Sequence, residues 1–390
     1  MTRTWYLLVL SFVAFVTTFG AHIVAVNLPV YAKQVGIGAL GIGLLISIYD
    51  FAEVFAKPLS GWLADRRGKV MTLVSGLLIF SLSSLLYLVV DPRLLIAIRL
   101  LQGLGAAAFS VVSLALVAEC FAEARGQALG VYNAVKGAGY VLSPAIGGAI
   151  VVASSFATIF IACAAVGGLA LLLSLTLREP AHSSGGADLD DDDDLNPRQM
   201  VAAFADRRMV PWYAVIVINM FFVGILFGFL AVYANSLGYD QVRVGLVVSL
   251  CTLTYLVVQP LSGILADRFG PAAIILAGLL LSGLSVIALS FTQGAALALV
   301  VILAGLGVGT VWTNCDTMVS SLARPGTLAS SMGAAGSFKE IGDMLGPLTI
   351  GALAEVAGLR VGFVLCGLLG LAAAAVVAYR QLQNNQPAST

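Results

Sequence analysis

Charged side chains recur inside long apolar stretches of this sequence, where each needs a partner or a chemical role. They form two groups with three- and four-residue spacings: Asp50, Glu53, Lys57, and Lys339, Glu340, Asp343. On a helix, residues three and four apart share one face. A charge in the middle of a bilayer costs about 2.5 kcal/mol or more, so such residues are expected to pair or to bind protons. Lys57 lies near the end of its stretch and can extend its ammonium to the membrane surface.

Other polar and aromatic residues in the apolar stretches are candidates for contacting a small molecule. They are His22, Asn27, Asn133, Lys136, Trp312, Asn314, Asp316, together with Tyr31, Tyr132, Asn219 and Tyr255. Histidine can carry a proton near physiological pH, although a lone histidine in an apolar helix also serves as a hydrogen-bonding core residue. The tyrosines can equally belong to an aromatic belt at the membrane surface.

Helices that cross a membrane must position these side chains. Of the 390 residues, 60% are hydrophobic and 10% are charged, and the mean hydropathy is +1.01, which is far from the composition of soluble domains. A spanning helix needs about 20 mainly apolar residues. The sequence predicts an all-α membrane protein with twelve spans: 5–30, 40–60, 70–90, 94–120, 126–150, 156–177, 210–233, 242–262, 272–291, 295–321, 328–354 and 361–378.

Basic residues between the spans predict the orientation, because Lys and Arg are retained on the cytoplasmic side. The inside set is Arg3, Arg66, Arg67, Lys69, Arg125, Arg178, Arg198, Arg207, Arg208, Arg268, Arg324 and Arg380. The outside set is Lys33, Arg93, Arg243 and Arg360. We therefore expect both termini in the cytoplasm, and a first span that is retained rather than cleaved.

The chain is internally duplicated. KPLSGWLADRRG at 57–68 returns as QPLSGILADRFG at 259–270, and LPVYA at 28–32 returns as LAVYA at 230–234. GVYNAVKGAGYVLSPAIGGA at 130–149 matches GAAGSFKEIGDMLGPLTIGA at 333–352. These blocks predict three parts: a six-helix bundle at 1–177, an acidic cytoplasmic linker at 178–209, and a second bundle with a short tail at 210–390. Parallel repeats of this kind place a substrate cavity between the halves.

Three motifs carry a resemblance to the major facilitator superfamily, in particular to its twelve-helix branch of drug or metabolite:proton antiporters. GWLADRRGK resembles the superfamily's signature loop after the second span. RLLQGLGAAA at 99–108 resembles a motif whose arginine is associated with proton coupling, although Arg99 could instead extend to the outer interface. GAGYVLSPAIGGA at 137–149 is similar to the element that marks antiporters, with Ser143 in place of a glycine.

The resemblance assigns conformational roles to the motif residues, in the loop and in both copies of the antiporter element. They are Gly61, Asp65, Arg66, Gly68, Gly139, Pro144, Gly148 and Pro347. It also implies that the second span packs beside the eleventh, so Asp50 or Glu53 would pair with Lys339 as a gate opened by a proton or a substrate. A permanent structural salt bridge is the alternative.

The implied function is alternating-access export of a small organic molecule in exchange for protons, across a bacterial inner membrane. Import of a small metabolite, anionic in view of Lys136 and Lys339, and a receptor that does not transport are the alternatives. The first span has no acidic residue, unlike that of many multidrug members, which argues against a multidrug-cation exporter.

The expected partners are a small-molecule substrate and the bilayer, with no nucleic acid, and the protein is expected to be a monomer. There is no ATP-binding loop or hydrolase nucleophile motif, so we expect no enzyme. No cofactor or metal is expected beside the coupling proton, because the five cysteines are scattered and the run DDDDD at 190–194 reads as solvated linker.

Overall fold

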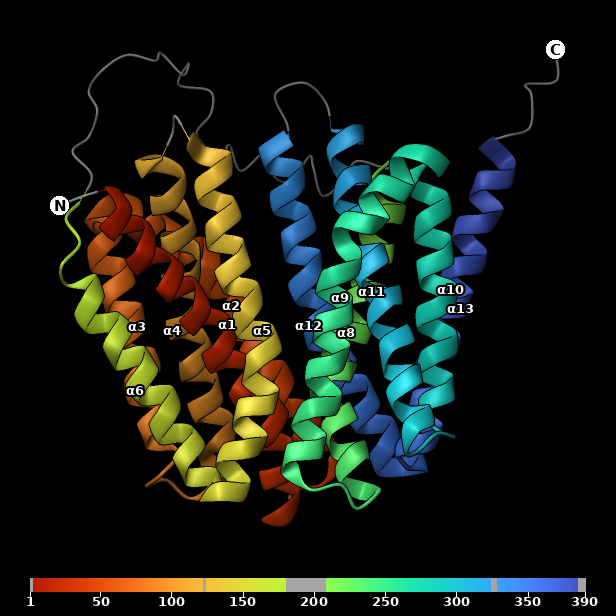
Figure 1. The fold of residues 1–390 in the computed structure, drawn as a ribbon, viewed down its shortest axis with the longest axis horizontal. Helices are drawn as coiled ribbons and strands as arrows, with labels where there is room; N and C mark the ends of the chain where they lie inside the picture. Colours follow the sequence, from red (N-terminus) through yellow and green to blue (C-terminus); the bar gives the residue numbers. More distant parts are fainter. Residues whose placement is uncertain (1–2, 122–123, 180–207, 324–327, 385–390) are drawn as a thin grey trace. The chain divides into compact units, whose positions relative to one another are not determined.

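The computed structural model describes residues 3–121, 124–179, 208–323 and 328–384. This part of the chain forms one 3-10 turn, η1 (Pro92–Leu94), and twelve α-helices, and it contains no strand (Figure 1). The helices are α1 (Arg3–Gln34), α2 (Ala39–Arg67), α3 (Lys69–Leu86), α4 (Leu95–Cys120), α5 (Arg125–Ala153), α6 (Phe156–Ser174), α8 (Val210–Ser236), α9 (Gln241–Phe269), α10 (Pro271–Leu289), α11 (Ala295–Leu322), α12 (Leu328–Ala357) and α13 (Leu359–Asn384). Each corresponds to one predicted span, so the predicted all-α fold is confirmed.

Eleven of these helices are long and apolar enough to cross a membrane. The remaining helix is α12, which carries Lys339, Glu340 and Asp343 near its middle. Helices are the expected solution for such sequences, since a helix satisfies its own backbone hydrogen bonds where no water is present. The charged group therefore lies in the helix whose sequence is least suited to lipid contact, where polar neighbours are needed most.

The helices pack into two compact units. The first unit comprises Met1–His182 and Leu226–Ser249, and the second comprises Ser183–Ile225 and Leu250–Thr390. Helices α8 and α9 therefore each contribute to both units. Residues 180–207, which include most of the predicted linker, lie outside the described residues, so the predicted domain boundaries stay a prediction.

Equivalent helix pairs of the two repeats approach each other at equivalent glycines. A Cβ atom added to Gly103 of α4 would lie 2.7 Å from the carbonyl oxygen of Tyr49 in α2. One added to Gly305 of α11 would meet the carbonyl oxygen of Cys251 in α9. Both members of the second pair lie 202 positions after the first. Small residues allow this backbone contact between membrane helices, and the duplication seen in the sequence is therefore a duplication of packing.

The helix pairs α1–α5 and α8–α12 also approach each other at equivalent glycines. A Cβ atom on Gly139 would lie 2.9 Å from the carbonyl oxygen of Phe15, and one on Gly342 would lie 2.5 Å from that of Val217. These contacts fix the rotation of α5 and α12 about their axes. The second of them determines where Lys339, one turn before Gly342, directs its side chain.

Candidate functional site

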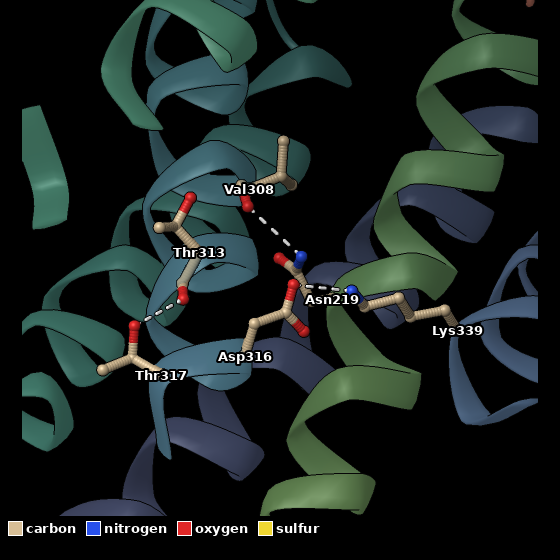
Figure 2. A network of polar contacts seen from close by, with 6 residues as sticks. All are labelled: Asn219, Val308, Thr313, Asp316, Thr317 and Lys339. Carbon is tan, nitrogen blue, oxygen red and sulfur yellow. Dashed lines mark hydrogen bonds and ion pairs between the residues drawn. The ribbon is translucent and has the colours of Figure 1, made fainter. Parts of the chain in front are cut away.

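A half-buried ion pair joins α11 and α12 in the second unit. Lys339 Nζ lies 2.7 Å from Asp316 Oδ2, and the two side chains are 19% and 28% exposed (Figure 2). The other carboxylate oxygen, Asp316 Oδ1, is buried and accepts no hydrogen bond in the described residues. The pair is thus a charge contact inside a membrane helix bundle, and Asp316 Oδ1 can still accept a hydrogen bond.

Aromatic rings flank this pair. Trp312 lies one turn before Asp316 on α11, and Lys339 Nζ is 4.9 Å from the centre of its ring. An ammonium at that distance from an indole face is attracted by the ring quadrupole. Tyr255 of α9 contacts the same indole, with ring centres 5.5 Å apart. The ammonium of Lys339 therefore has a carboxylate and an aromatic face as partners.

Asn219 of α8 adds a second polar group. Its Nδ2 donates to the carbonyl oxygen of Val308 at 3.2 Å, while its Oδ1 is buried and has no partner among the described residues. Because a backbone carbonyl can only accept, this bond fixes which end of the amide is the nitrogen. Figure 2 draws the Asn219 amide in one view with the Asp316–Lys339 pair, and in the described residues no hydrogen bond joins Asn219 Oδ1 to either of them.

Asn314, a sequence candidate, is placed differently. Two residues on a helix differ by about 200° in direction, so its side chain leaves α11 on the side away from Trp312 and Asp316. It is fully buried, and its Nδ2 donates to the carbonyl oxygen of Thr310 at 2.7 Å. The structure therefore separates Asn314 from the cluster that contains Asp316, Lys339 and Trp312.

In the first unit, Arg99 is a charged residue of the core. It is 2% exposed, so it does not extend to the interface. Its NH1 group donates to Gln102 Oε1 at 2.7 Å, and its guanidinium lies 4.1 Å from the centre of the Tyr49 ring. Its Nε is buried without a partner in the described residues.

Gln102 holds this arrangement in place. Its Nε2 donates to Ser84 Oγ at 3.0 Å, and Tyr87 donates its hydroxyl hydrogen to Gln102 Oε1 at 3.3 Å. The amide is thereby oriented with its oxygen toward the guanidinium. A cation stabilised by a ring and an amide dipole can attract a nearby carboxylate, and so influence the proton affinity of acids around it.

Two ion pairs involve residues of the predicted gate. Glu53 pairs with Lys57 at 2.6 Å, one turn along α2, and Lys339 pairs with Asp316. Lys57 is therefore a partner of Glu53, and its extension to the membrane surface stays a prediction. The predicted pair between Lys339 and Asp50 or Glu53 would join the two units and also stays a prediction; within the second unit, the rotation of α12 directs Lys339 to α11.

Four further candidates of the first unit have distinct surroundings. The Nδ1 of His22 lies 2.8 Å from the carbonyl oxygen of Thr18, which requires a hydrogen on Nδ1. Asn27 is buried and donates to the carbonyl oxygen of Ile23, so it belongs to the helix packing. Asn133 is exposed, and Lys136 is half-buried.

The rings of Tyr140 and Phe227 cover His22, with ring centres 4.3 and 4.6 Å from the imidazole. The second nitrogen, Nε2, is then the ring atom that can accept a hydrogen bond or a proton. The sequence did not indicate either aromatic partner, because they come from α5 and α8.

The signature loop joins α2 to α3 through Gly68, whose φ of 104° suits glycine rather than other residues. Arg66 stacks on Trp62 at 4.5 Å, and Lys69 pairs with Glu119 at 2.9 Å. Nothing lies within 4 Å of a Cβ added to Gly61. The side chain of Asp65 lies outside the described residues.

A carboxylate that the sequence analysis missed caps α3. Glu179, after the end of α6, accepts hydrogen bonds from the backbone N–H groups of Lys69 and Val70, the latter at 2.9 Å. A negative charge at a helix N-terminus is stabilised by the helix dipole and by the unpaired N–H groups. Glu179 therefore anchors the loop from the end of the sixth span.

The antiporter element in α5 is held by another residue that was not predicted. Ser249 Oγ donates to the carbonyl oxygen of Val141 at 2.7 Å and accepts from the N–H of Ala145 at 3.1 Å. A regular helix would bond these two backbone groups to each other, so the hydroxyl of α9 bridges the turn at Pro144. Gly148 packs on the Gln241 backbone close by. In the second copy, Pro347 packs against Gly224 of α8.

Comparisons with known proteins identify the family. The model described as Major Facilitator Superfamily matches residues 10–244 and 212–389. "Multidrug resistance protein MdtG" of Enterobacter lignolyticus is 26% identical over 370 residues, covering 92% of this chain and 87% of that protein. "Quinolone resistance protein NorA" of Staphylococcus aureus is 29% identical over 179 residues, or 45% and 46% of the two chains.

Solved structures of transporters share the fold. The nucleoside transporter NupG (D323A mutant) superposes with a TM-score of 0.85 at 15% identity, covering 96% of this chain and 99% of its own. A D-xylose-proton symporter superposes with a TM-score of 0.79 at 14% identity, covering 97% of each chain. Because the family model spans both repeats, this chain is a membrane transporter, not an enzyme, and it belongs to the Major Facilitator Superfamily.

Proposed function

We propose that this protein is a proton-coupled antiporter that exports a small organic molecule by alternating access. It acts in a bacterial inner membrane as a monomer, with both termini in the cytoplasm. Relatives over most of its length are named multidrug resistance proteins, which favours export. The observation that carries the proposal is the ion pair between Lys339 and Asp316 inside the second unit.

The pair offers one carboxylate for two competing partners. When Asp316 is ionised, it holds the ammonium of Lys339 or a bound substrate; when it takes up a proton, that attraction is lost. Proton and substrate then exclude each other, which is the minimum requirement for exchange rather than cotransport. Each state favours a different arrangement of α11 and α12, so the equilibrium between conformations responds to proton binding.

Arg99 supplies a fixed positive charge in the first unit. Arginine stays ionised under all physiological conditions, so it is suited to attract a carboxylate but not to carry the proton. The candidate proton carriers are the acids Asp50, Glu53, Asp316, Glu340 and Asp343, together with His22. We assign the coupling proton to Asp316, because its pairing with Lys339 changes when it is protonated.

Everted membrane vesicles test this function. With an acid interior and an acridine dye as reporter, an antiporter exchanges added solute for internal protons, so the quenched fluorescence recovers. Ethidium and a quinolone are the first solutes to try, in view of the names of the relatives. We expect recovery with wild type and none with Asp316→Asn.

Asp240→Asn is the matched control, because Asp240 is a carboxylate with a 55% exposed side chain on the loop before α9. It should behave like wild type. A symporter would instead move protons out only when the solute is preloaded inside the vesicles. Full recovery in Asp316→Asn would contradict the assignment of this residue.

A further inference from the structure

The geometry points to a self-occupied cation site: we propose that the Lys339 ammonium fills a site built by Asp316 and Trp312, and that the exported molecule is an organic ammonium with an aromatic body which displaces it. Asp316 then supplies the carboxylate that the first span of this chain lacks. The proposal rests on the function given above and names the class of its substrate. The site is the ion pair drawn in Figure 2 together with the neighbouring Trp312.

Lys339 makes the contacts that a bound ammonium would make. Its nitrogen lies 2.7 Å from Asp316 Oδ2 and 4.9 Å from the centre of the Trp312 ring. A carboxylate and an aromatic face are the two groups with which proteins bind ammonium ligands. The ring of Tyr255 beside Trp312 extends the aromatic surface for the body of the ligand.

The polar atoms left over at this site accept hydrogen bonds. In the described residues of the second unit, the buried side-chain atoms without a partner are Asn219 Oδ1, Asn314 Oδ1 and Asp316 Oδ1. Of these, Asp316 Oδ1 lies on the carboxylate that pairs with Lys339. A buried acceptor without a donor costs about 1–3 kcal/mol, and an ammonium brings up to three N–H donors. An anionic ligand would bring further acceptors and leave this oxygen unsatisfied.

A ligand can displace Lys339 from the ion pair more easily than it can displace Asp316. Lysine carries its charge on a flexible stem of four carbons and is strongly hydrated, so Lys339 can withdraw toward water when a ligand takes its place. The Asp316 carboxylate is on a short side chain one turn after Trp312 on the same helix, so it cannot withdraw in this way. An anion that captured Lys339 would leave that carboxylate without a cation, which is unfavourable.

The fraction of time for which Lys339 occupies the site determines how much it weakens the binding of an external ammonium. If the pair is closed for more than nine-tenths of the time, the apparent dissociation constant of an external ammonium is raised about tenfold or more. Removing the ammonium while keeping the carboxylate should therefore strengthen binding. A residue whose loss improves ligand binding distinguishes a competitor from a structural partner.

The test compares three probes with one body and different head charges: 4-phenylbutylammonium, 4-phenylbutanol and 4-phenylbutyrate. Their dissociation constants are measured by titration calorimetry on the purified full-length protein in detergent micelles at one pH. The variants are Lys339→Gln, Lys339→Arg, Asp316→Asn and Asp316→Glu, each checked for a monodisperse elution profile.

We expect 4-phenylbutylammonium to bind Lys339→Gln about tenfold or more tightly than wild type, and Lys339→Arg to resemble wild type because it keeps the competing cation. Asp316→Asn should lose binding of this probe. Asp316→Glu should retain part of it, which guards against a folding defect. 4-Phenylbutanol should bind all variants weakly and equally, and 4-phenylbutyrate should bind wild type and Lys339→Gln weakly.

Tighter binding of 4-phenylbutyrate to wild type, lost in Lys339→Gln, would overturn the proposal in favour of an anion site. Unchanged ammonium affinity in Lys339→Gln would overturn it too. Calorimetry needs no proton gradient, so its failure is distinguishable from that of the antiport function. If proton exchange is observed with other solutes and the ammonium probe does not bind, the substrate class is wrong but the function stands.

Discussion

The pair between Asp316 and Lys339 should be energetically coupled, and a double-mutant cycle measures that coupling. The perturbations are Asp316→Asn, Lys339→Gln and the double variant. Each single variant leaves one buried charge without its partner, while the double variant removes both charges and keeps side chains of similar volume. The double variant should therefore be more stable than the sum of the single effects predicts.

The magnitude follows from the distance and the burial. At 2.7 Å and an effective dielectric constant of about 20, direct attraction is roughly 6 kcal/mol, and desolvation offsets much of it. Removing one partner of a fully buried pair costs about 3–5 kcal/mol. With side chains 28% and 19% exposed, we expect about 2–4 kcal/mol for each single variant and a coupling energy of about 2–3 kcal/mol.

The assay is reversible unfolding of the purified protein in mixed micelles, followed by tryptophan fluorescence. Arg243→Gln is the control, since Arg243 and Asp240 form a 3.6 Å pair with side chains 71% and 55% exposed. Surface pairs contribute about 0–1 kcal/mol, so this variant should unfold close to wild type. A coupling energy below about 0.5 kcal/mol for Asp316 and Lys339 would refute the reasoning.

Three other predictions concern the scaffold and the loop. Arg99→Lys should destabilise the protein by about 1–2 kcal/mol in the same assay, because an ammonium cannot both stack on a ring and bond Gln102 as the planar guanidinium does; an unchanged unfolding curve would contradict this. Gly305→Val should lower the yield of folded protein sharply, because its side chain would overlap the backbone of α9, whereas Gly263→Val, with open space around its Cβ, should not. Asp65→Asn should slow proton-driven transport with expression intact, as the resemblance of its loop implies, and flux at the wild-type rate would refute that role.

The sequence predicted the helices and their duplication because both depend on local pattern. Apolar length determines which segments span the membrane, and the glycine and proline positions are repeated along the chain. Gly103 and Gly305 illustrate the result, since both lie at the contact between the second and fourth helices of their repeat. Backbone contacts of this kind depend on residue size at one position, which a sequence displays directly.

The partners of the charges could not be predicted in this way. The sequence suggested an acid of the second span as the partner of Lys339, and it did not indicate Asp316 of the adjacent helix, with which Lys339 pairs. The choice depends on the rotation of α12, which is set by contacts of Gly342 with α8. Spacing within one helix indicates which residues share a face, but not which neighbour that face meets.

Two residues were missed for the same reason. Ser249 and Glu179 bond to backbone groups that are distant in the sequence. A serine in an apolar helix and a glutamate before an acidic segment have no distinctive local pattern. The role of each residue is recognised from its partner, which is a proline turn for Ser249 and a helix N-terminus for Glu179. Those partners come close only when the helices are assembled.

The cap on α3 determines where the protein can be divided into separately expressed halves. A cut after residue 177, the end of the predicted first bundle, would remove Glu179 from the fragment whose third helix it caps. The N–H groups of Lys69 and Val70 would then lack their acceptor, and the signature loop would lose its anchor. A split version or an inserted fluorescent reporter should therefore keep Glu179 joined to α6, with the junction placed further along the chain.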